Sequence, residues 1–158
     1  MSDGAMLSWT RTPWAELGRD DLYDALTLRQ LVFSVEQACA YLDCDGVDRM
    51  CIHVFGRGTD GVLHAYARVM GPGVKYAEAA IGRVVTHPDV RRTGAGRALM
   101  RESIACVVDA FGPGPIRIGA QRYLERFYGS FGFVVASEPY LEDGIPHVEM
   151  RREAGPPT

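Results

Sequence analysis

The chain has 158 residues, of which 47% are apolar and 23% charged, and this ordinary globular composition predicts a single domain. Its 17 basic and 20 acidic side chains give a net charge of -3, which argues against nucleic acid as the main partner. No apolar run approaches the roughly 18–20 residues of a membrane span, and the N-terminus lacks the pattern of a secretory signal, so we expect a cytoplasmic protein with no membrane partner.

The first half of the chain predicts three strands and one helix. The strands are expected at 7–10, 51–56 and 62–70, with a turn across Gly58–Gly61 between the last two. Asp20 and Asp21 open the helix, which fades near Gln37. Its apolar face follows from residues spaced i, i+3, i+4 and i+7, namely Leu28, Leu31, Val32 and Val35.

The second half alternates strands and helices. We expect a strand at 79–86, a helix at 94–111, a strand at 116–120, a helix at 122–131, a strand at 133–136, a loop at 138–146 and a last strand at 147–151. The long helix has one apolar face, formed by Met100, Ile104, Val107, Val108 and Phe111. This order predicts an α/β (α+β) fold, one mixed sheet flanked by helices. The domain is expected over 7–152, with flexible termini at 1–6 and 153–158.

Four cysteines raise the question of disulfides or a metal. A chain of this length without a secretory signal needs no disulfide framework, so we expect reduced thiols at Cys39, Cys44, Cys51 and Cys106. The first three and His53 form a loose cluster, but their spacing is wider than that of structural zinc sites. The sequence therefore predicts no zinc.

Acidic residues follow the first helix. Asp43, Asp45, Gly46 and Asp48 resemble the start of a calcium loop, but Val54 stands at position twelve, where the loop needs a glutamate. We therefore expect a polar turn here, and no metal.

The stretch from Val84 to Leu99 carries the strongest indication of function. A β-branched strand runs into a loop that contains Gly94 and Gly96, where a helix begins. Glycine lets the backbone approach a ligand closely. Amides at a helix start have no intrahelical partner and lie at the positive end of the helix dipole. Together these features predict a site for a phosphate or diphosphate.

The charge of this stretch supports an anion site. Residues 83–101 hold five arginines and one acid, namely Arg83, Arg91, Arg92, Arg97, Arg101 and Asp89. The lysine of a P-loop is missing after Gly96, and Leu99 stands where a dinucleotide fingerprint has its third glycine. The alternative interpretation is a tight turn that leads into a helix with solvated arginines.

The segment Arg91-Arg92-Thr93-Gly94-Ala95-Gly96 resembles the Q/R-x-x-G-x-G/A motif of the GNAT superfamily of N-acetyltransferases. The preceding strand that ends in His87-Pro88, and the later Phe127-Tyr128-Gly129-Ser130-Phe131-Gly132-Phe133, match two other landmarks in order and spacing. Within the superfamily, the chain is similar to ElaA-type members through residues 28–37, 81–84, 119–121 and 142–147. The resemblance covers about residues 7–152.

This resemblance implies that the sheet splays open at its middle and binds acetyl-CoA there. The backbone of Val84, Val85 and Thr86 would pair with the pantetheine arm like an added strand. The diphosphate would lie on the amides of Arg92 to Arg97. The implied cofactor-binding set is Val84, Val85, Thr86, Arg91, Arg92, Thr93, Gly94, Ala95, Gly96, Arg97 and Gln121. Gln121 replaces a common asparagine and offers its amide from a longer arm.

Tyr128 matches the tyrosine that protonates the departing thiolate in many members of the superfamily. A phenol near a thiolate can donate a proton or a hydrogen bond as negative charge develops. The phenylalanines beside it in the sequence, Phe127, Phe131 and Phe133, are expected in the core.

No single residue is marked as the base that would take a proton from the acceptor amine. Glu36, in the first helix, is the first candidate for this catalytic role. His147 is the next, and with Glu142 it is also expected to bind the acceptor. His53 and Arg68 on the early strands are weaker candidates. The amine could also lose its proton in bulk solvent.

The leading interpretation is direct transfer of acetyl from acetyl-CoA to a primary amine, without a covalent enzyme intermediate. A pocket flanked by Glu36, Glu142 and Asp143 would suit a cationic acceptor, either a small molecule or a peptide. The alternative is an acyl-CoA-binding sensor or interaction module with little turnover. A homodimer is also an option, because many relatives form dimers.

Overall fold

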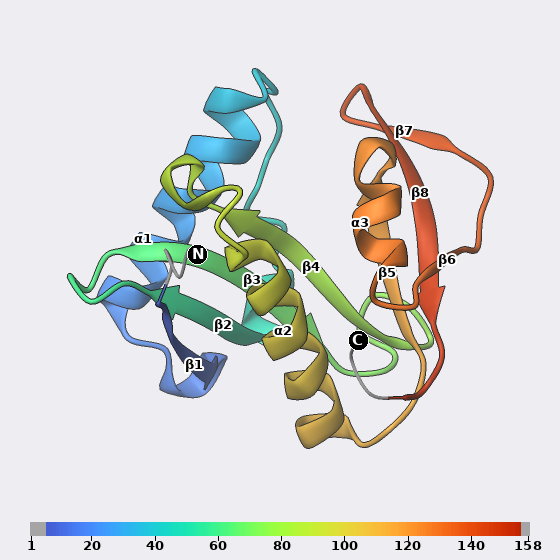
Figure 1. The fold of residues 1–158 in the computed structure, drawn as a ribbon, viewed down its shortest axis with the longest axis horizontal. Coiled ribbons are helices and arrows are strands. Elements are labelled where there is room, and N and C mark those ends of the chain that lie inside the picture. The colour runs from blue at the N-terminus through green and yellow to red at the C-terminus, as the bar shows by residue number, and fades with distance from the viewer. Residues whose placement is uncertain (1–5, 156–158) are drawn as a thin grey trace.

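One eight-stranded sheet organises residues 6–155, the part of the chain that this computed structural model describes (Figure 1). The strands are β1 Ser8–Pro13, β2 Ile52–Arg57, β3 Leu63–Met70, β4 Ala79–Thr86, β5 Ile116–Gln121, β6 Val134–Val135, β7 Tyr140–Glu142 and β8 Ile145–Arg152. The helices are α1 Arg19–Arg29, α2 Ala95–Phe111 and α3 Glu125–Gly129, with a π-helix η2 at Gln30–Glu36. Short 3-10 turns are η1 Trp14–Glu16, η3 Val47–Met50, η4 Pro88–Val90 and η5 Arg122–Leu124.

The sheet is mixed and opens at its middle. Its strand order is β1-β2-β3-β4-β5-β8-β6, with β7 paired to β8. β4 and β5 run parallel and pair only at their first residues, where Ala79 faces Ile116 and Ala80 faces Arg117. Beyond these pairs the two strands separate, and the sheet falls into two halves (Figure 1). The predicted fold class and the predicted splay are confirmed.

Two helices cover opposite faces of the first half of the sheet. Side chains alternate along a strand, so Val54 of β2 packs in the cluster under α2, whereas its neighbour Phe55 packs beside α1. The α2 side holds the larger core, to which Met100, Ile104 and Val107 of α2 contribute as predicted. The predicted apolar face of this helix is wrong at its end, because Phe111 is 40% exposed.

A bulge in β4 changes which side chains face which side. The register with β3 shifts by one residue at Arg83 and Val84, and Arg83 adopts a φ of 49°, which is uncommon for a residue with a side chain. Because of this extra residue, Ile81 packs in the α2 cluster while Val85, four positions later, packs in the α1 cluster. The bulge lies where β4 borders the split.

Several predicted elements are confirmed to within one residue at each end, namely the strands at 51–56, 62–70, 79–86 and 116–120 and the helix at 94–111. The strand at 7–10 continues to Pro13, and the strand at 133–136 shrinks to two residues. The predicted helix at 122–131 is shorter, because it begins as the 3-10 turn η5 and ends at Gly129.

The predicted helix from Asp20 to Gln37 changes its type part-way. After Arg29 it widens into the π-helix η2, in which the amide of Gln37 bonds the carbonyl of Val32, five residues back. Apolar spacing does not distinguish the two helix types over so short a stretch, and π-turns are rare.

The predicted loop at 138–146 is wrong. Its residues form the hairpin of β7 and β8, in which Glu142 faces Ile145 across a two-residue turn. Asp143 and Gly144 in that turn have φ angles of 51° and 79°. Positive φ at both positions is the mark of a type I′ turn, for which Asp-Gly is a preferred pair.

The described elements run from Ser8 to Arg152, and the predicted domain boundaries of 7 and 152 stay a prediction. Most of the expected flexible termini, residues 1–5 and 156–158, lie outside the described residues. Across residues 6–155, no helix has both the length and the apolar character that crossing a bilayer requires.

Candidate functional site

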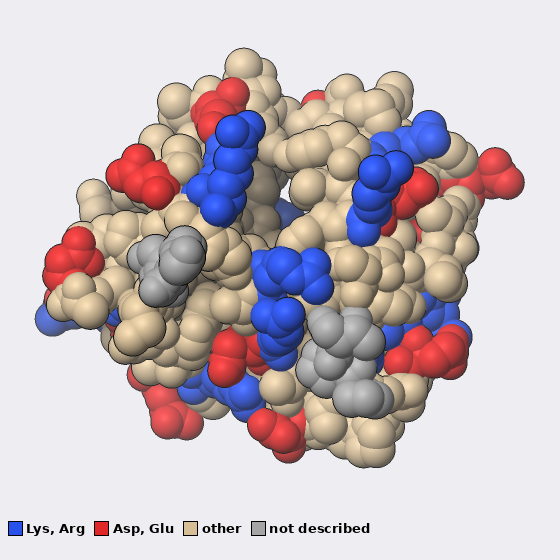
Figure 2. Space-filling model, in the orientation of Figure 1, with Lys and Arg blue, Asp and Glu red and all other residues tan. Residues whose placement is uncertain are grey.

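A cleft of about 900 Å³ opens where β4 and β5 diverge. Its walls come from η2, β4, the 91–97 loop, β5, α3 and the β7–β8 hairpin. Basic side chains border the hollow between the two halves of the molecule (Figure 2). The cleft brings together the sequence-predicted residues from both halves, including Glu36, Gly94, Gln121, Tyr128 and His147.

The loop before α2 has the geometry that the sequence predicted for an anion site. Gly94 has a φ of 90° and is the N-cap of α2, and its carbonyl accepts the first helical bond from the Ala98 amide at 3.0 Å. The amides between these two residues therefore have no intrahelical partner. The Thr93 hydroxyl donates to the Val90 carbonyl, and this hydrogen bond links the two ends of the turn that precedes Gly94.

The arginines of this stretch have different partners. Arg91 donates to both carboxylate oxygens of Glu36 at 2.6 Å, which joins the loop to η2 across the cleft mouth. Arg97 donates to the Ser130 hydroxyl and lies over the Phe131 ring. Arg83 bonds Asp43 at 2.8 Å. The charges of both Arg83 and Arg91 are therefore already paired with carboxylates in the free protein.

The edge of β4 that faces the split has no partner strand beyond Ala80 among the described residues. Val84, Val85 and Thr86 line the cleft along this edge. Backbone N–H and C=O groups on an open edge can pair with an extended ligand. The edge leads from the 91–97 loop toward the interior of the cleft.

Tyr128 contributes a protonated phenol to the cleft. Its side chain is 6% exposed, with its ring edge-to-face against Phe127 and Phe133. Burial raises the pKa of Tyr128 above its usual range. No hydrogen bond holds its hydroxyl within residues 6–155. Tyr128 can therefore donate a proton to a bound group, while Phe131 and Phe133 are core residues as predicted.

Glu36 and Gln121 both have partners across the cleft. The hydrogen bonds from Arg91 lower the pKa of Glu36, which makes its carboxylate a weaker base. The side-chain amide of Gln121 exchanges hydrogen bonds of 3.3 Å with that of Gln37, which follows η2. This amide pair bridges the two halves of the molecule.

His147 and Glu142 lie on the hairpin that forms the far wall. The Nδ1 of His147 is 2.7 Å from the carbonyl oxygen of Ile145, and its Nε2 is 3.7 Å from a carboxylate oxygen of Glu142. The imidazole stacks on the Tyr140 ring with centroids 5.8 Å apart. Both predicted acceptor residues therefore reach the cleft from adjacent strands.

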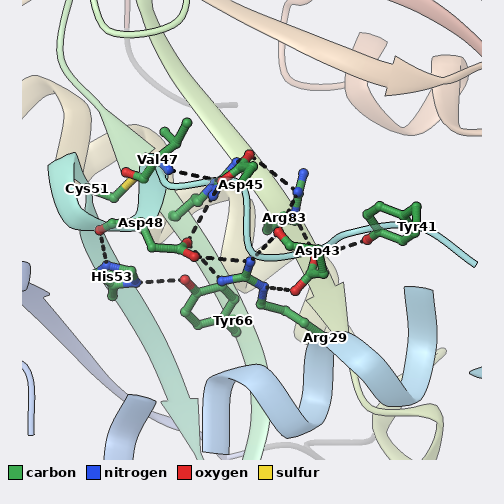
Figure 3. Close-up of polar contacts among 11 residues, drawn as sticks. Arg29, Tyr41, Asp43, Asp45, Val47, Asp48, Cys51, His53, Tyr66 and Arg83 are labelled. Atoms are coloured by element: carbon green, nitrogen blue, oxygen red, sulfur yellow. Dashed lines mark hydrogen bonds and ion pairs between the residues drawn. The ribbon is translucent and has the colours of Figure 1, made fainter. Parts of the chain in front are cut away.

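Sequence reasoning missed a buried ionic cluster beside the cleft (Figure 3). We define the arginine–aspartate cluster as three arginines and three aspartates, namely Arg29, Arg68, Arg83, Asp43, Asp45 and Asp48. Arg29 and Arg68 are fully buried, and both bond the same Asp48 oxygen at 2.8 and 2.9 Å. The predicted polar turn at 43–48 therefore places Asp43 and Asp48 in a buried ionic cluster, which the sequence did not indicate.

The cluster fastens the segment that carries one wall of the cleft. Asp43 bonds Arg29 of α1 and Arg83 of β4, and it also accepts from the hydroxyl of Tyr41, which lines the cleft. Cys39, another lining residue, donates its thiol to the carbonyl of Asp143 on the opposite hairpin. The available sequence signal was three arginines within or beside otherwise apolar segments, where each needs an anionic partner.

Cys51 and His53 bond different partners. The Cys51 thiol donates to the Val47 carbonyl, and burial raises the pKa of Cys51 to about 11. His53 uses one ring nitrogen with the Tyr66 hydroxyl and the other with the Asp48 carbonyl, and burial lowers its pKa. Across residues 6–155, no three His, Cys, Asp or Glu side chains are grouped to hold a metal ion.

Known proteins match this chain over most of its length. The family described as "Acetyltransferase (GNAT) domain" matches residues 59–154. The Escherichia coli (strain K12) protein ElaA is 38% identical over 150 residues, which cover 94% of this chain and 97% of ElaA. A UPF0039 protein of Schizosaccharomyces pombe is 43% identical over 134 residues, 84% of this chain and 88% of that protein.

Solved structures of known proteins also match this chain over most of its length. The crystal structure of E. coli ElaA matches with a TM-score of 0.87 at 38% identity, over 94% of this chain and all of that one. An acyl-CoA N-acyltransferase from Pseudomonas aeruginosa matches with a TM-score of 0.88 at 39% identity, over 92% of this chain and 99% of that one. The chain belongs to the GNAT acetyltransferase family. The predicted ElaA-like resemblance is confirmed, and the family uses acyl-CoA.

The arginine–aspartate cluster of this GNAT protein should contribute to the free energy of unfolding. Replacement of Asp48 by Asn should lower the free energy of unfolding by about 3–5 kcal/mol, because it leaves the three arginines of the cluster with two carboxylates and so one buried positive charge uncompensated. Chemical denaturation at pH 7 measures this loss. The matched control is Asp109→Asn, which removes an exposed partner of Arg11 and should cost less than about 1 kcal/mol. Equal losses in the two variants would contradict the assignment.

The contribution of Asp48 to the free energy of unfolding should also depend on pH. Burial alone would raise the pKa of Asp48, but the hydrogen bonds and charges of Arg29 and Arg68 prevail and lower it. A lowered carboxylate pKa stabilises the fold above the ordinary aspartate value of about 3.9, and this stabilisation is lost as the pH falls through the folded value. The difference between wild type and Asp48→Asn should therefore narrow below about pH 4.

Proposed function

We propose that this GNAT protein transfers the acetyl group of acetyl-CoA directly to the nitrogen of a primary amine. One observation carries the proposal: a single cleft joins the amides after Gly94, the open edge of β4 and the Tyr128 hydroxyl. These features suit the diphosphate, the pantetheine arm and the thioester sulfur of one extended ligand. A volume of about 900 Å³ is in the upper part of the range for small-molecule sites, about 300–1,000 Å³, and so leaves room for an acceptor.

The residues around the cleft fit the parts of this ligand. The amides from Ala95 to Arg97 and the backbone of Arg92 to Gly94 would hold the diphosphate, with Arg91 as a side-chain donor. The open edge from Val84 to Thr86 would pair with the amide groups of the pantetheine arm. Gln121 would give up its hydrogen bonds with Gln37 and donate its side-chain amide to the ligand from the opposite wall of the cleft.

Tyr128 would serve as the general acid. The neutral amine attacks the thioester carbon, the carbon–sulfur bond breaks, and the sulfur leaves with the electron pair. Tyr128 keeps its proton at neutral pH, since the ordinary tyrosine pKa of about 10 is already well above 7 and burial raises it further, so it can protonate this sulfur. It then regains a proton from the nitrogen, which is acidic once bonded to the acyl carbon. An ammonium acceptor loses two protons in all: one ends on the thiol and one reaches solvent.

The acceptor end of the cleft is acidic. Glu142 and Asp143 line the cleft from the β7–β8 hairpin, whereas the arginines of the 91–97 loop line it from another element. Their charge would attract a cationic amine, either small or in a peptide. We propose an amine of this class as the acceptor.

Glu36 is better suited to control Arg91 than to act as the base. Both of its oxygens accept from Arg91 in the free protein, and this lowers the pKa of Glu36. A diphosphate would compete for the same guanidinium donors. Binding of acetyl-CoA would then release Glu36 and separate the loop from η2.

A Tyr128→Phe variant tests the chemical step. With acetyl-CoA and a panel of primary amines, we expect kcat to fall by about 100-fold, while the Kd for acetyl-CoA measured by calorimetry stays within about twofold. Tyr23→Phe is the matched control, because Tyr23 lies exposed on α1 outside the cleft. Binding without turnover by wild type on every amine would favour the acyl-CoA sensor instead.

A Gly96→Leu variant tests the diphosphate site. A Cβ at Gly96 would meet the Phe127 ring at 3.7 Å, an ordinary contact, so the helix start should tolerate the change. Leucine is also the better helix former, by about 0.8–1 kcal/mol. We expect an unchanged or higher Tm and a Kd for acetyl-CoA raised at least about tenfold, because the side chain blocks approach to the amides. Gly94 is a poorer target, since its φ of 90° strains any substitution.

Gly114→Leu controls for the change of residue, because Gly114 follows α2 and nothing lies within 4 Å of its Cβ position. Unchanged acetyl-CoA affinity in Gly96→Leu would remove the diphosphate from this loop.

A Glu36→Gln variant tests the competition for Arg91. Loss of the ion pair should free Arg91 and lower the Kd for acetyl-CoA about two- to fivefold, the range expected for an exposed pair. Glu102→Gln removes another exposed partner of an arginine far from the cleft and should change nothing. A weaker affinity with kcat unchanged would show that Glu36 positions Arg91 for the diphosphate. A collapse of kcat at unchanged affinity would make Glu36 the base.

A further inference from the structure

His147 is held in one tautomer with one nitrogen free. Its Nδ1 lies 2.7 Å from the Ile145 carbonyl, which can only accept, so Nδ1 carries the proton. In the neutral ring the lone pair is then on Nε2. Stacking on Tyr140 fixes the ring plane, and only 8% of the His147 side chain is exposed. His147 lines the cleft, so a bound acceptor can come close to its ring.

The other candidate bases are occupied. Arg91 holds both oxygens of Glu36. His53 is buried with both ring nitrogens bonded, and Arg68 is a buried cation within the arginine–aspartate cluster. Among the candidates that the sequence raised, His147 alone combines a free lone pair, a fixed orientation and a place in the cleft wall.

Glu142 lies where it can accept the proton from His147 and pass it to solvent. Its carboxylate lies 3.7 Å from Nε2, too far for a hydrogen bond, and its side chain is half-exposed. Nε2 therefore has no hydrogen-bond partner within residues 6–155, and the carboxylate is near enough to receive a proton from the ring through one water. A solvent-exposed carboxylate can then pass the proton to water.

We propose that His147 is the general base of the transfer, a role that rests on the proposed function. Nε2 accepts one proton from the ammonium form of the acceptor, which makes the nitrogen lone pair available for attack on the thioester. The proton leaves through Glu142 to solvent, and His147 returns to its neutral form. Tyr128 protonates the sulfur separately, so the two proton transfers occur on different residues.

Other titratable groups lie around His147. Glu142 and Tyr140 face it from β7, and Asp143 lies in the turn between the two strands. Tyr76 approaches the Tyr140 hydroxyl beside Gly119. The neighbour on β5 is Gln121, which carries no charge.

The test compares two acceptors that differ in their need for a base. Butylamine is an ammonium ion at pH 7, whereas methoxyamine is already neutral there. His147→Gln should lower kcat/KM for the alkylamine by about 100-fold or more, because a general base typically contributes 10²–10⁴-fold. The loss for methoxyamine should be less than about fivefold. Glu142→Gln should cost the alkylamine a smaller factor, about threefold to tenfold.

A pH profile gives the second readout. The rise of kcat/KM for the alkylamine with increasing pH should lose its histidine limb in His147→Gln and keep it in the control His64→Gln. His64 is a suitable control because it lies at the start of β3, outside the residues that line the cleft.

Each outcome decides one question. Equal losses on the two acceptors, or an unchanged pH profile, would overturn the base assignment and leave the acetyltransferase function intact. If the wild type binds acetyl-CoA but acetylates neither probe nor any amine of the panel, the proposed function itself fails, and the base assignment fails with it. A selective loss on the alkylamine, with unchanged acetyl-CoA affinity, supports His147 as the base.

Discussion

The separation of β4 from β5 is the constraint on which the rest of the structure depends. Two neighbouring strands that would normally pair along their length do so at only two positions, and then diverge. This leaves backbone donors and acceptors of β4 without strand partners, which is costly unless water or a ligand satisfies them. The same divergence creates the cleft, places the 91–97 loop at one end and brings the β7–β8 hairpin opposite η2. An open edge is therefore a structural weakness, and an extended molecule that pairs with it would satisfy these backbone groups.

The arginine–aspartate cluster supports this opening from one side. A sheet that divides cannot rely on strand pairing to fix the segments around the gap, so another interaction must hold the chain between η2 and β2. Charged groups buried together fix geometry more strictly than apolar contacts, because each hydrogen bond has a preferred direction. Arg83 belongs to the cluster because the bulge in β4 gives it a positive φ beside the gap. The bulge thus couples the cluster to the strand that borders the cleft.

Much of the fold could be predicted from the sequence, because most of its signals are local. Alternating and helical apolar patterns depend on neighbours a few residues away, and they located β2, β3, β4, β5 and α2 to within one residue. The β7–β8 hairpin was also within reach, since Asp143-Gly144 is a preferred turn pair, but a short strand with a polar outer face resembles a loop. The widening of α1 into η2 had no local signal. For the candidate site, motif spacing pointed to the glycine loop and Tyr128, and the structure places them on one cleft, whereas the arginine–aspartate cluster beside it had no comparable motif.

The sequence by itself determined the family, the mixed sheet and the helix start at Gly94, because backbone conformation and periodicity are properties of short segments. Only the tertiary structure decided the partners of the charged residues. Arg83 lies in the same basic stretch as Arg91, yet the first bonds Asp43 and the second bonds Glu36, from segments about 40 and 55 residues away. Ion pairing between residues so far apart in the sequence depends on how strands and helices pack. The order of charges along the sequence does not show which residues will pair. The tautomer of His147 was decided in the same way, by a carbonyl that the hairpin brings to its ring.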